Sequence, residues 1–414
     1  MPRRKFDTTQ RGISDTHTDA PIATSICENK LVYAERIRTL RAAANLSQGE
    51  LAEAMNLGRA AISNWETGRT RPDIANIPRL CNVLGITVAA FFSDTPEEEG
   101  WKDARIVPEG PITMDPACVT LHYAQETFEG MKAYRTAEGK IQLFRPEMNA
   151  KRMINSNARL CMPELPVDMF VEAVKALVKV EEDWVPSEPE TSLYIRPFMF
   201  ATEAALGVHM ASAYKFMIIC CPVGAYYAEG INPVKILVED ELVRAVKGGT
   251  GFTKCGGNYA GSILGQVKAE KMGYSQVLWL DGEHRKYVEE VGTMNIMFKI
   301  AGEIYTAPIE GTVLPGVTRD SMIHLLRDWG YKVNETRLSV DDLMKAGHDG
   351  TLEEVFGTGT AAVISPVGEL RYKDDVVTIN DFKIGELTQK LYDTLTGIQW
   401  GRLPDKYGWT VEVK

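Results

Sequence analysis

One short segment of this chain combines the residue types needed for covalent chemistry on a carbonyl group. Residues 252–259 read FTKCGGNY, which places Lys254 beside two glycines and ahead of Tyr259. Glycines let the backbone approach a ligand closely, and burial would lower the pKa of Lys254 until its amine is a nucleophile. A phenol at Tyr259 could then donate to an oxyanion. Taken alone, such an octapeptide more often marks a surface lysine beside a turn.

The segment that follows offers a carboxylate as a second reactive group. Apolar runs at 276–280 and 287–300 flank Asp281 and Gly282 and predict two paired strands. Strand side chains alternate, so Glu289 and Glu290 must face opposite sides, and we expect one of them to be buried. A buried carboxylate needs a cationic partner, which the protonated pyridine of a lysine-bound aldehyde cofactor would supply. Two solvated glutamates are the alternative.

Alternating strands and helices are predicted to position these groups. The expected strands are Cys118–Tyr123, Ile141–Phe144, Ser192–Pro197 and Tyr214–Cys221, and the expected helices are Arg145–Leu160 and Val167–Trp184. After a connection beginning at Gly224, a second α/β unit is expected to run to Lys414. This pattern predicts two α/β domains with a ligand in the crevice between them.

Seven motifs in one order carry a resemblance to a known family. They are LHYAQETFEGMKA (121–133), SLYIRP (192–197), KCGGNY (254–259), QVLWLD (276–281), EVGTMN (290–295), LPGVTR (314–319) and GTGTAA (357–362). With them, the chain from about Trp101 to its C-terminus resembles the branched-chain amino-acid aminotransferases, pyridoxal 5′-phosphate enzymes of fold type IV. The usual family member has a further opening segment, which a different domain replaces here.

The resemblance implies pyridoxal 5′-phosphate as cofactor and assigns residues to it. Lys254 would bind it covalently and then carry a proton to and from the substrate. Glu290 would keep the pyridine nitrogen protonated, and Tyr259 would donate to the phenolate oxygen. The phosphate would be held by four residues: Arg152, Val317, Thr318 and Thr360. No metal site is predicted.

The resemblance also implies a substrate pocket and a reaction. Its apolar walls would be Tyr123, Phe128, Tyr194 and Tyr226, with Val208 contributed by the partner subunit of a homodimer. Arg196 and the backbone of Ala361 and Ala362 would bind carboxylates, including the distal carboxylate of glutamate. The implied reaction exchanges the amino group of leucine, isoleucine or valine with 2-oxoglutarate by a ping-pong mechanism. An alternative is a transcription regulator that uses this part as a sensor of cofactor or amino acid.

Short helices are predicted before the enzyme part. Their expected ranges are 31–41, 47–55, 59–67, 71–84 and 88–92. The sequence SQGE at 47–50 is a capping box, which is typical of the start of a helix. Two of these helices flank a three-residue turn at Asn56–Gly58, which is the outline of a helix-turn-helix.

This segment resembles the Cro and phage-repressor type of DNA-binding domain. The resemblance rests on LSQGELA (46–52), ISNWETG (62–68), RP (71–72) and LCNVLG (80–85). By position, Gln48 would hold a phosphate, and the major groove would be faced by Arg59, Ala60, Ser63 and Asn64. Seven basic and six acidic residues between Leu31 and Asp94 nearly balance. A protein-contact role for this domain therefore stays open.

The predicted fold is an all-α five-helix domain followed by a two-domain α/β fold. The expected parts are a disordered tail (1–30), the helix-turn-helix domain (31–94), a small α/β domain (95–223), a connection (224–235) and a large α/β domain (236–414). A net charge of −10 gives no global attraction for nucleic acid. No apolar run reaches membrane-spanning length, and seven irregularly spaced cysteines favour a reducing, cytoplasmic compartment.

Overall fold

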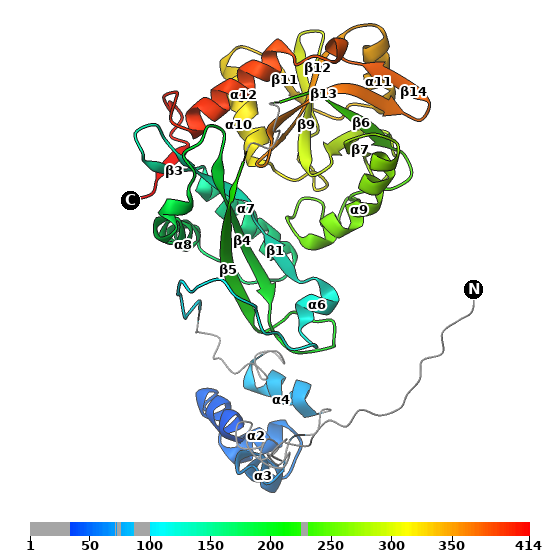
Figure 1. Ribbon diagram of the computed structural model, residues 1–414. Helices are drawn as coiled ribbons and strands as arrows, with labels where there is room; N and C mark the ends of the chain where they lie inside the picture. The colour runs from blue at the N-terminus through cyan, green and yellow to red at the C-terminus, as the bar shows by residue number, and fades with distance from the viewer. Residues whose placement is uncertain (1–33, 71, 73–75, 87–99, 225–230) are drawn as a thin grey trace, which may run out of the picture. The chain divides into compact units, whose positions relative to one another are not determined.

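The computed structural model describes residues 34–70, 72, 76–86, 100–224 and 231–414 (Figure 1). Contacts divide the chain into two compact units, Met1–Gly100 and Trp101–Lys414. Three predictions fall outside the described residues: the tail at 1–30, the fifth short helix at 88–92 and the pocket residue Tyr226.

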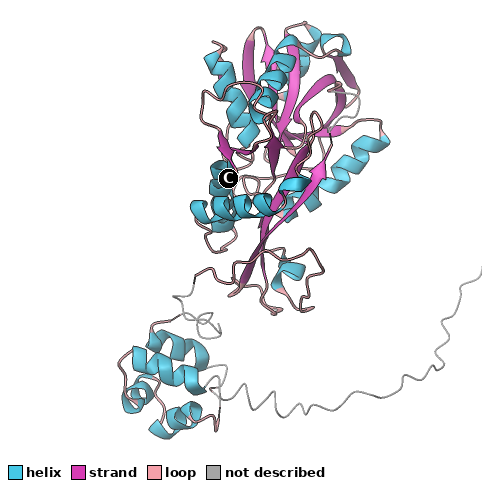
Figure 2. Cartoon of the chain, turned by 60° about the vertical axis from the view of Figure 1, so that its left-hand side comes forward, coloured by secondary structure: helices cyan, strands magenta, loops and turns pink. Residues whose placement is uncertain are grey.

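The first unit is helical in its described part (Figure 2). Residues 34–43 form a helix, followed by α2 (Gln48–Ala54), α3 (Arg59–Glu66) and α4 (Ile77–Leu84). The predicted capping box is confirmed, because the Glu50 N–H donates to Ser47 Oγ at 3.2 Å and the Ser47 N–H donates to Glu50 Oε2 at 2.7 Å. Fully buried Ile37, Leu51 and Ile62 join these helices in one core.

The start that the sequence predicts for the fourth helix, Arg71, lies outside the described residues, as do residues 73–75. The described helix α4 covers Ile77–Leu84. Its end matches the expected Leu84. Gly85 caps it with φ 70°, a left-handed conformation that glycine adopts without strain.

Six strands form the first sheet of the second unit. They are β1 (Glu126–Phe128), β2 (Met131–Arg135), β3 (Ile141–Phe144), β4 (Ser192–Ala201), β5 (Tyr214–Val223) and β15 (Thr410–Glu412). The order is β1-β4-β2-β3-β15, β5 also pairs with β4, and every pairing is antiparallel. Helices α7 (Pro146–Arg159) and α8 (Val167–Val180) share a core with this sheet. The short helix η2 (Glu182–Trp184) follows α8.

One predicted strand in this unit is wrong. The segment Cys118–Tyr123 contains the short helix α6 (Val119–Tyr123), and Cys118 makes only an isolated bridge to Ala204. Ala124 ends the helix with φ 50°, and its N–H donates to the Thr120 carbonyl. Short apolar runs fit a helix turn and a strand equally well, and here no neighbouring described strand pairs with the run.

Nine strands form the second sheet. They are β6 (Val234–Glu239), β7 (Gln276–Leu280), β8 (Val288–Val291), β9 (Met294–Ile300), β10 (Glu303–Thr306), β11 (Val333–Glu335), β12 (Leu352–Gly359), β13 (Val363–Tyr372) and β14 (Asp375–Thr378). The order is β11-β10-β9-β12-β13-β6-β7-β8, and β14 pairs with β13. Because β8 also pairs with β9, six of these strands close into a ring. The predicted pairing of the strands around Asp281 is confirmed as β7 against β8.

Helices connect the strands of the second sheet and bring the candidate residues to their ends. They are α9 (Gly256–Lys271), α10 (Val317–Asp328), α11 (Val340–His348) and α12 (Glu386–Gln399), and the short helix η3 (Asn380–Phe382) precedes α12. The parallel strands β6 and β7 are joined through α9, which lies beside them (Figure 1). Lys254 therefore sits in the connection just before α9, a usual place for a ligand site in an α/β unit.

Among the described residues, the structure contains neither a candidate membrane-spanning helix nor a candidate metal site. Within these ranges, no helix is both long and apolar enough to cross a membrane. In the same part of the chain, no group of histidine, cysteine, aspartate and glutamate side chains is arranged to hold a metal ion.

Candidate active site

Lys254 is held by strand β1 and by helices α7 and α9. Its carbonyl accepts the Phe128 N–H of β1 at 3.0 Å, and its own N–H donates to Ser156 Oγ of α7 at 3.0 Å. Its Nζ donates to the Tyr259 hydroxyl at 2.7 Å and lies 4.8 Å from the centre of the Phe128 ring. The lysine and tyrosine singled out in the sequence therefore meet at one point.

The pKa of the Lys254 amine is lowered into the physiological range, so a substantial fraction of the amine is neutral near pH 7. Burial and, second, the charge of Arg152 lower its pKa to about 7. Burial raises the pKa of Tyr259, so its phenol keeps its proton. A neutral amine that contacts a protonated phenol can attack an electrophilic carbon and exchange a proton with it.

Arg152 projects from α7 and is fixed by a buried carboxylate. Its Nε and Nη2 donate to the two oxygens of Glu129 at 2.8 and 2.7 Å. Its Nη1 donates to the Pro315 carbonyl at 3.2 Å. The guanidinium is thus held against the loop that leads into α10. The sequence motifs did not single out Glu129, although its place next to Phe128 inside a motif was a signal.

The loop at Leu314–Gly316 leads directly into the N-terminus of α10. Gly316 caps this helix, and Val317 and Thr318 are its first two residues. The first N–H groups of a helix have no partner within it and favour anions such as phosphate. Arg152 adds its positive charge to the same loop. These residues therefore form a cradle suited to a phosphate group.

Glu290 lies in β8, and both oxygens of its carboxylate have polar partners. Oε1 accepts the side-chain amide of Asn295 at 3.0 Å and the N–H of Leu314 at 2.9 Å, and Oε2 lies 2.8 Å from Arg244 Nε. Burial raises its pKa, and the charge of Arg244 opposes that rise. The sequence gives no sign of the role of Arg244, because nothing in its spacing sets it apart from a surface arginine.

The expected burial of one of the two adjacent glutamates is confirmed, and its neighbour is buried as well. Glu289 is 8% exposed and Glu290 is 4% exposed. They face opposite sides, as predicted, but the ring of strands and its surrounding segments cover β8 on both faces. Glu289 accepts the Thr312 hydroxyl at 2.5 Å, and burial raises its pKa.

Three of the predicted substrate residues lie around Lys254. Arg196 Nη2 donates to the Tyr194 hydroxyl at 2.8 Å, and its guanidinium lies 4.7 Å from the centre of the Phe128 ring. The charge of Arg196 also contributes to the lowered pKa of Lys254. Tyr123 makes no described contact with Lys254, Phe128 or Arg196. It is 39% exposed, and its hydroxyl donates to the Leu206 carbonyl.

The turn between β12 and β13 carries Thr360, Ala361 and Ala362. A buried lysine of β2, Lys132, reaches this turn and donates from Nζ to the Ala361 carbonyl at 2.8 Å. Burial lowers the pKa of Lys132 to about 8. The contact joins residues 229 positions apart, so no local sequence pattern could have indicated it.

The candidate DNA-binding residues lie on the two helices of the helix-turn-helix. Arg59 and Ala60 are exposed on α3, whereas Ser63 and Asn64 are half-buried. Gln48 donates its side-chain amide to Glu66 Oε2 at 2.8 Å. Glu66 is 2% exposed and also accepts Arg41 Nε at 2.5 Å.

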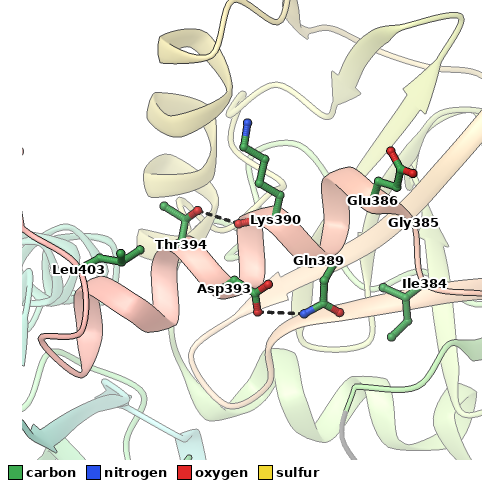
Figure 3. A pocket seen from close by; sticks show the side chains of 8 residues that line it. All are labelled: Ile384, Gly385, Glu386, Gln389, Lys390, Asp393, Thr394 and Leu403. Carbon is green, nitrogen blue, oxygen red and sulfur yellow. Dashed lines mark hydrogen bonds between the residues drawn. The ribbon is translucent and has the colours of Figure 1, made fainter. Parts of the chain in front are cut away.

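A surface hollow of about 510 Å³ along α12 is separate from these groups (Figure 3). It is lined by Ile384, Gly385, Glu386, Gln389, Lys390, Asp393, Thr394 and Leu403. Gln389 and Asp393 hydrogen-bond to each other across one turn of the helix at 2.9 Å. None of the residues assigned to cofactor or substrate lines it.

The residues around Lys254 fit pyridoxal 5′-phosphate by their chemistry. They offer a neutral amine for its aldehyde, a phenol for its phenolate oxygen and a buried carboxylate for its ring nitrogen. A guanidinium and a helix N-terminus are available for its phosphate.

Comparisons with known proteins show the family to which this chain is similar. The model of the class IV amino-transferase family matches residues 126–370, and a helix-turn-helix model matches residues 37–91. "Branched-chain-amino-acid aminotransferase 2" of Bacillus subtilis is 54% identical over 323 residues, which cover 78% of this chain and 89% of the relative. A "Probable branched-chain-amino-acid aminotransferase" of Staphylococcus epidermidis is 55% identical over 353 residues, covering 84% and 96%.

Solved structures show the same fold. A branched-chain amino acid aminotransferase in complex with pyridoxamine 5′-phosphate aligns with a TM-score of 0.65 at 30% identity, covering 74% of this chain and 96% of that one. The Escherichia coli enzyme aligns with a TM-score of 0.63 at 27% identity, covering 73% and 94%. The chain therefore belongs to the pyridoxal 5′-phosphate-dependent class IV aminotransferases, within the branched-chain-amino-acid aminotransferase family, and carries a helix-turn-helix domain at its N-terminus.

Proposed function

We propose that this protein exchanges the amino group of leucine, isoleucine or valine with 2-oxoglutarate by a ping-pong mechanism. The observation that carries the proposal is the buried, neutral amine of Lys254 on the hydroxyl of Tyr259. The high identity to relatives named branched-chain-amino-acid aminotransferases supports the substrate class.

Pyridoxal 5′-phosphate would supply an aldehyde for the amino group and a ring that takes up charge from the substrate α-carbon. Arg152, Thr360 and the first N–H groups of α10, at Val317 and Thr318, would bind its phosphate. Glu290 would stabilise a proton on the ring nitrogen. Tyr259 would donate a hydrogen bond from its hydroxyl to the phenolate oxygen.

Lys254 would move the proton at the substrate α-carbon. Its Nζ can both accept and return that proton, because a pKa of about 7 leaves the neutral and the protonated amine populated near pH 7. The bonds from Phe128 and Ser156 to the backbone of Lys254 would keep the amine directed at the reacting carbon.

Substrates would bind between Lys254 and the aromatic group on the first sheet. Phe128 and Tyr194 would contact the aliphatic side chain, Arg196 would bind a carboxylate, and the N–H groups of Ala361 and Ala362 would bind another. Tyr123 would complete the wall in a homodimer, together with Val208 of the second copy. The exposure of 39% at Tyr123 and 83% at Val208 supports such an arrangement.

We further propose that residues 31–94 form a five-helix domain that binds DNA, with Gln48, Arg59, Ala60, Ser63 and Asn64 at the interface. The exposure of Arg59 and Ala60 on α3 supports this role. The small and large α/β domains would span 95–223 and 236–414, joined by 224–235. A cytoplasmic location suits a protein with free cysteines at several described positions.

Turnover measured over a panel of amino donors tests the enzymatic proposal. Leucine, isoleucine and valine should each convert 2-oxoglutarate to glutamate, whereas aspartate and lysine should not. Lys254→Ala should abolish turnover and the visible absorption of the bound cofactor. A protein that keeps this absorption but transfers the amino group of no aliphatic amino acid would contradict the proposal.

A further inference from the structure

Glu126 and Arg196 lie on the same face of the first sheet. Glu126 in β1 is opposite Phe200 in β4, and Phe128 is opposite Phe198. Directly opposed residues share a face, and side chains two positions apart do so as well. Glu126, Phe128 and Arg196 therefore project to one side, which is the side where Arg196 covers the Phe128 ring.

Arg196 has no carboxylate partner among the described residues. Its contacts are the Tyr194 hydroxyl and the faces of the Phe128 and Tyr194 rings. Within the described ranges, its buried Nε has no hydrogen-bond partner. A half-buried guanidinium in this state favours an incoming carboxylate.

Glu126 is a half-buried carboxylate that also lacks an ion pair within the described part of the chain. Its Oε1 accepts the N–H of Gly256, the first residue of α9, two positions after Lys254. Burial raises its pKa, while the Gly256 N–H and then the charge of Arg196 oppose the rise. Arg196 thus acts electrostatically on Glu126 without being neutralised by it.

We propose that Glu126 determines substrate specificity by repelling the side-chain carboxylate of glutamate or 2-oxoglutarate at Arg196. The negative charge of Glu126 near Arg196 weakens the binding of a dicarboxylate substrate, because it repels the second carboxylate. An aliphatic side chain carries no charge, so its binding is unaffected. Glu126 would thereby set the balance between the two substrate classes that share one pocket. The inference rests on the proposed function, in which Arg196 binds that carboxylate.

Glu126→Gln separates the charge from the contact with α9. Glutamine keeps a side-chain oxygen that can accept the Gly256 N–H, so the support next to Lys254 is retained. The KM for glutamate and for 2-oxoglutarate should fall by about three- to tenfold, as expected for removing one partly screened charge repulsion. The KM for leucine should change by less than about twofold on the same grounds. Each half-reaction is followed separately by the absorbance of the bound cofactor.

Glu126→Ala is the matched variant that removes both the charge and the contact. It should lower kcat for all substrates in addition to lowering the KM for glutamate. If Glu126→Gln leaves the ratio of the glutamate and leucine KM values unchanged, or shifts both values equally, Glu126 has only a structural role and the inference is overturned. A wild-type protein that is inactive with leucine and glutamate alike would instead contradict the proposed function.

Discussion

At the scale of single residues, burial decides the protonation states on which the proposed chemistry depends. It lowers the pKa of Lys254 to about 7 and raises those of Tyr259 and Glu290. Burial shifts all three pKa values because water is excluded from the region that these groups share. At Glu290 the positive charge of Arg244 opposes this shift and favours the carboxylate form that the proposed chemistry requires. Arg152 and Arg244 provide the compensating positive charges.

The lowered pKa of Lys254 predicts how the cofactor-free protein reacts with pyridoxal 5′-phosphate. Only the neutral amine attacks an aldehyde, so the rate should rise with pH, reach half its maximum near pH 7 and then level off. An exposed lysine would continue to gain rate up to about pH 10. Stopped-flow absorbance from pH 6 to 9 measures how the reaction rate depends on pH. Lys254→Ala is the control, because it should show no absorbance change from reaction with the cofactor. A rate that is still climbing steeply at pH 9 would disprove the assignment.

Glu290→Gln should lower turnover by about a hundredfold or more, since a proton at the ring nitrogen is no longer stabilised by a negative charge. Cofactor affinity should change much less, because the phosphate contacts remain. The matched control is Glu289→Gln, a neighbour that bonds to Thr312 on the other side of β8 and should keep most of its turnover. Steady-state kinetics and a cofactor titration measure the two effects. Equal losses in both variants would show that the strand, and not the Glu290 carboxylate, is responsible.

At the scale of elements, the ends of strands and helices carry the site. Lys254 precedes α9, Glu290 lies near the end of β8, and the loop at Leu314–Gly316 leads into α10. Glu290 and Arg152 both bond to this loop, through the Leu314 N–H and the Pro315 carbonyl. The loop therefore couples the group for the ring nitrogen to the group for the phosphate.

Gly316→Ala should weaken cofactor binding about tenfold or more, because overpacking of about 1–3 kcal/mol would fall on the proposed phosphate cradle. An added Cβ would overlap Asn295 Oδ1, and Asn295 also bonds to Glu290 and Leu314. The dissociation constant, measured by fluorescence titration, reports the change. The same substitution at Gly261 of α9, where a Cβ meets nothing within 4 Å, should leave binding intact. An unchanged affinity in Gly316→Ala would exclude this loop as the cradle.

At the scale of the whole molecule, an enzyme unit and a helix-turn-helix domain share one chain. The net charge of −10 opposes general attraction to DNA, so any contact must depend on local charge such as that of Arg59. Half-buried Arg41 and Gln48 donate hydrogen bonds to buried Glu66 and so join the helices of the domain. The helices of this domain therefore present a fixed surface, whether its partner is DNA or another protein.

If the domain binds DNA, the full-length protein should be retained by duplex DNA at low salt, and log affinity should fall linearly with log salt concentration. Arg59→Ala should weaken binding and reduce that slope by about one. Arg105→Ala, an exposed arginine of the other unit, is the control and should change nothing. Electrophoretic mobility shifts at several salt concentrations provide the measurement. No retention at low salt would leave this domain with a protein-contact role.

The sequence by itself determined the chemistry and many local structures. The order of seven motifs carried the family resemblance, which predicts the roles of Lys254, Tyr259 and Glu290. The SQGE box placed the start of α2, and the local apolar pattern located β3 at Ile141–Phe144. These two elements depend on residues close together in the chain, where spacing reports directly on geometry. Only the tertiary structure decided that both adjacent glutamates are buried, that Arg244 pairs with Glu290 and that residues 119–123 form a helix. Burial and ion pairing depend on segments far apart in the chain, whose meeting is set by packing and not by local pattern.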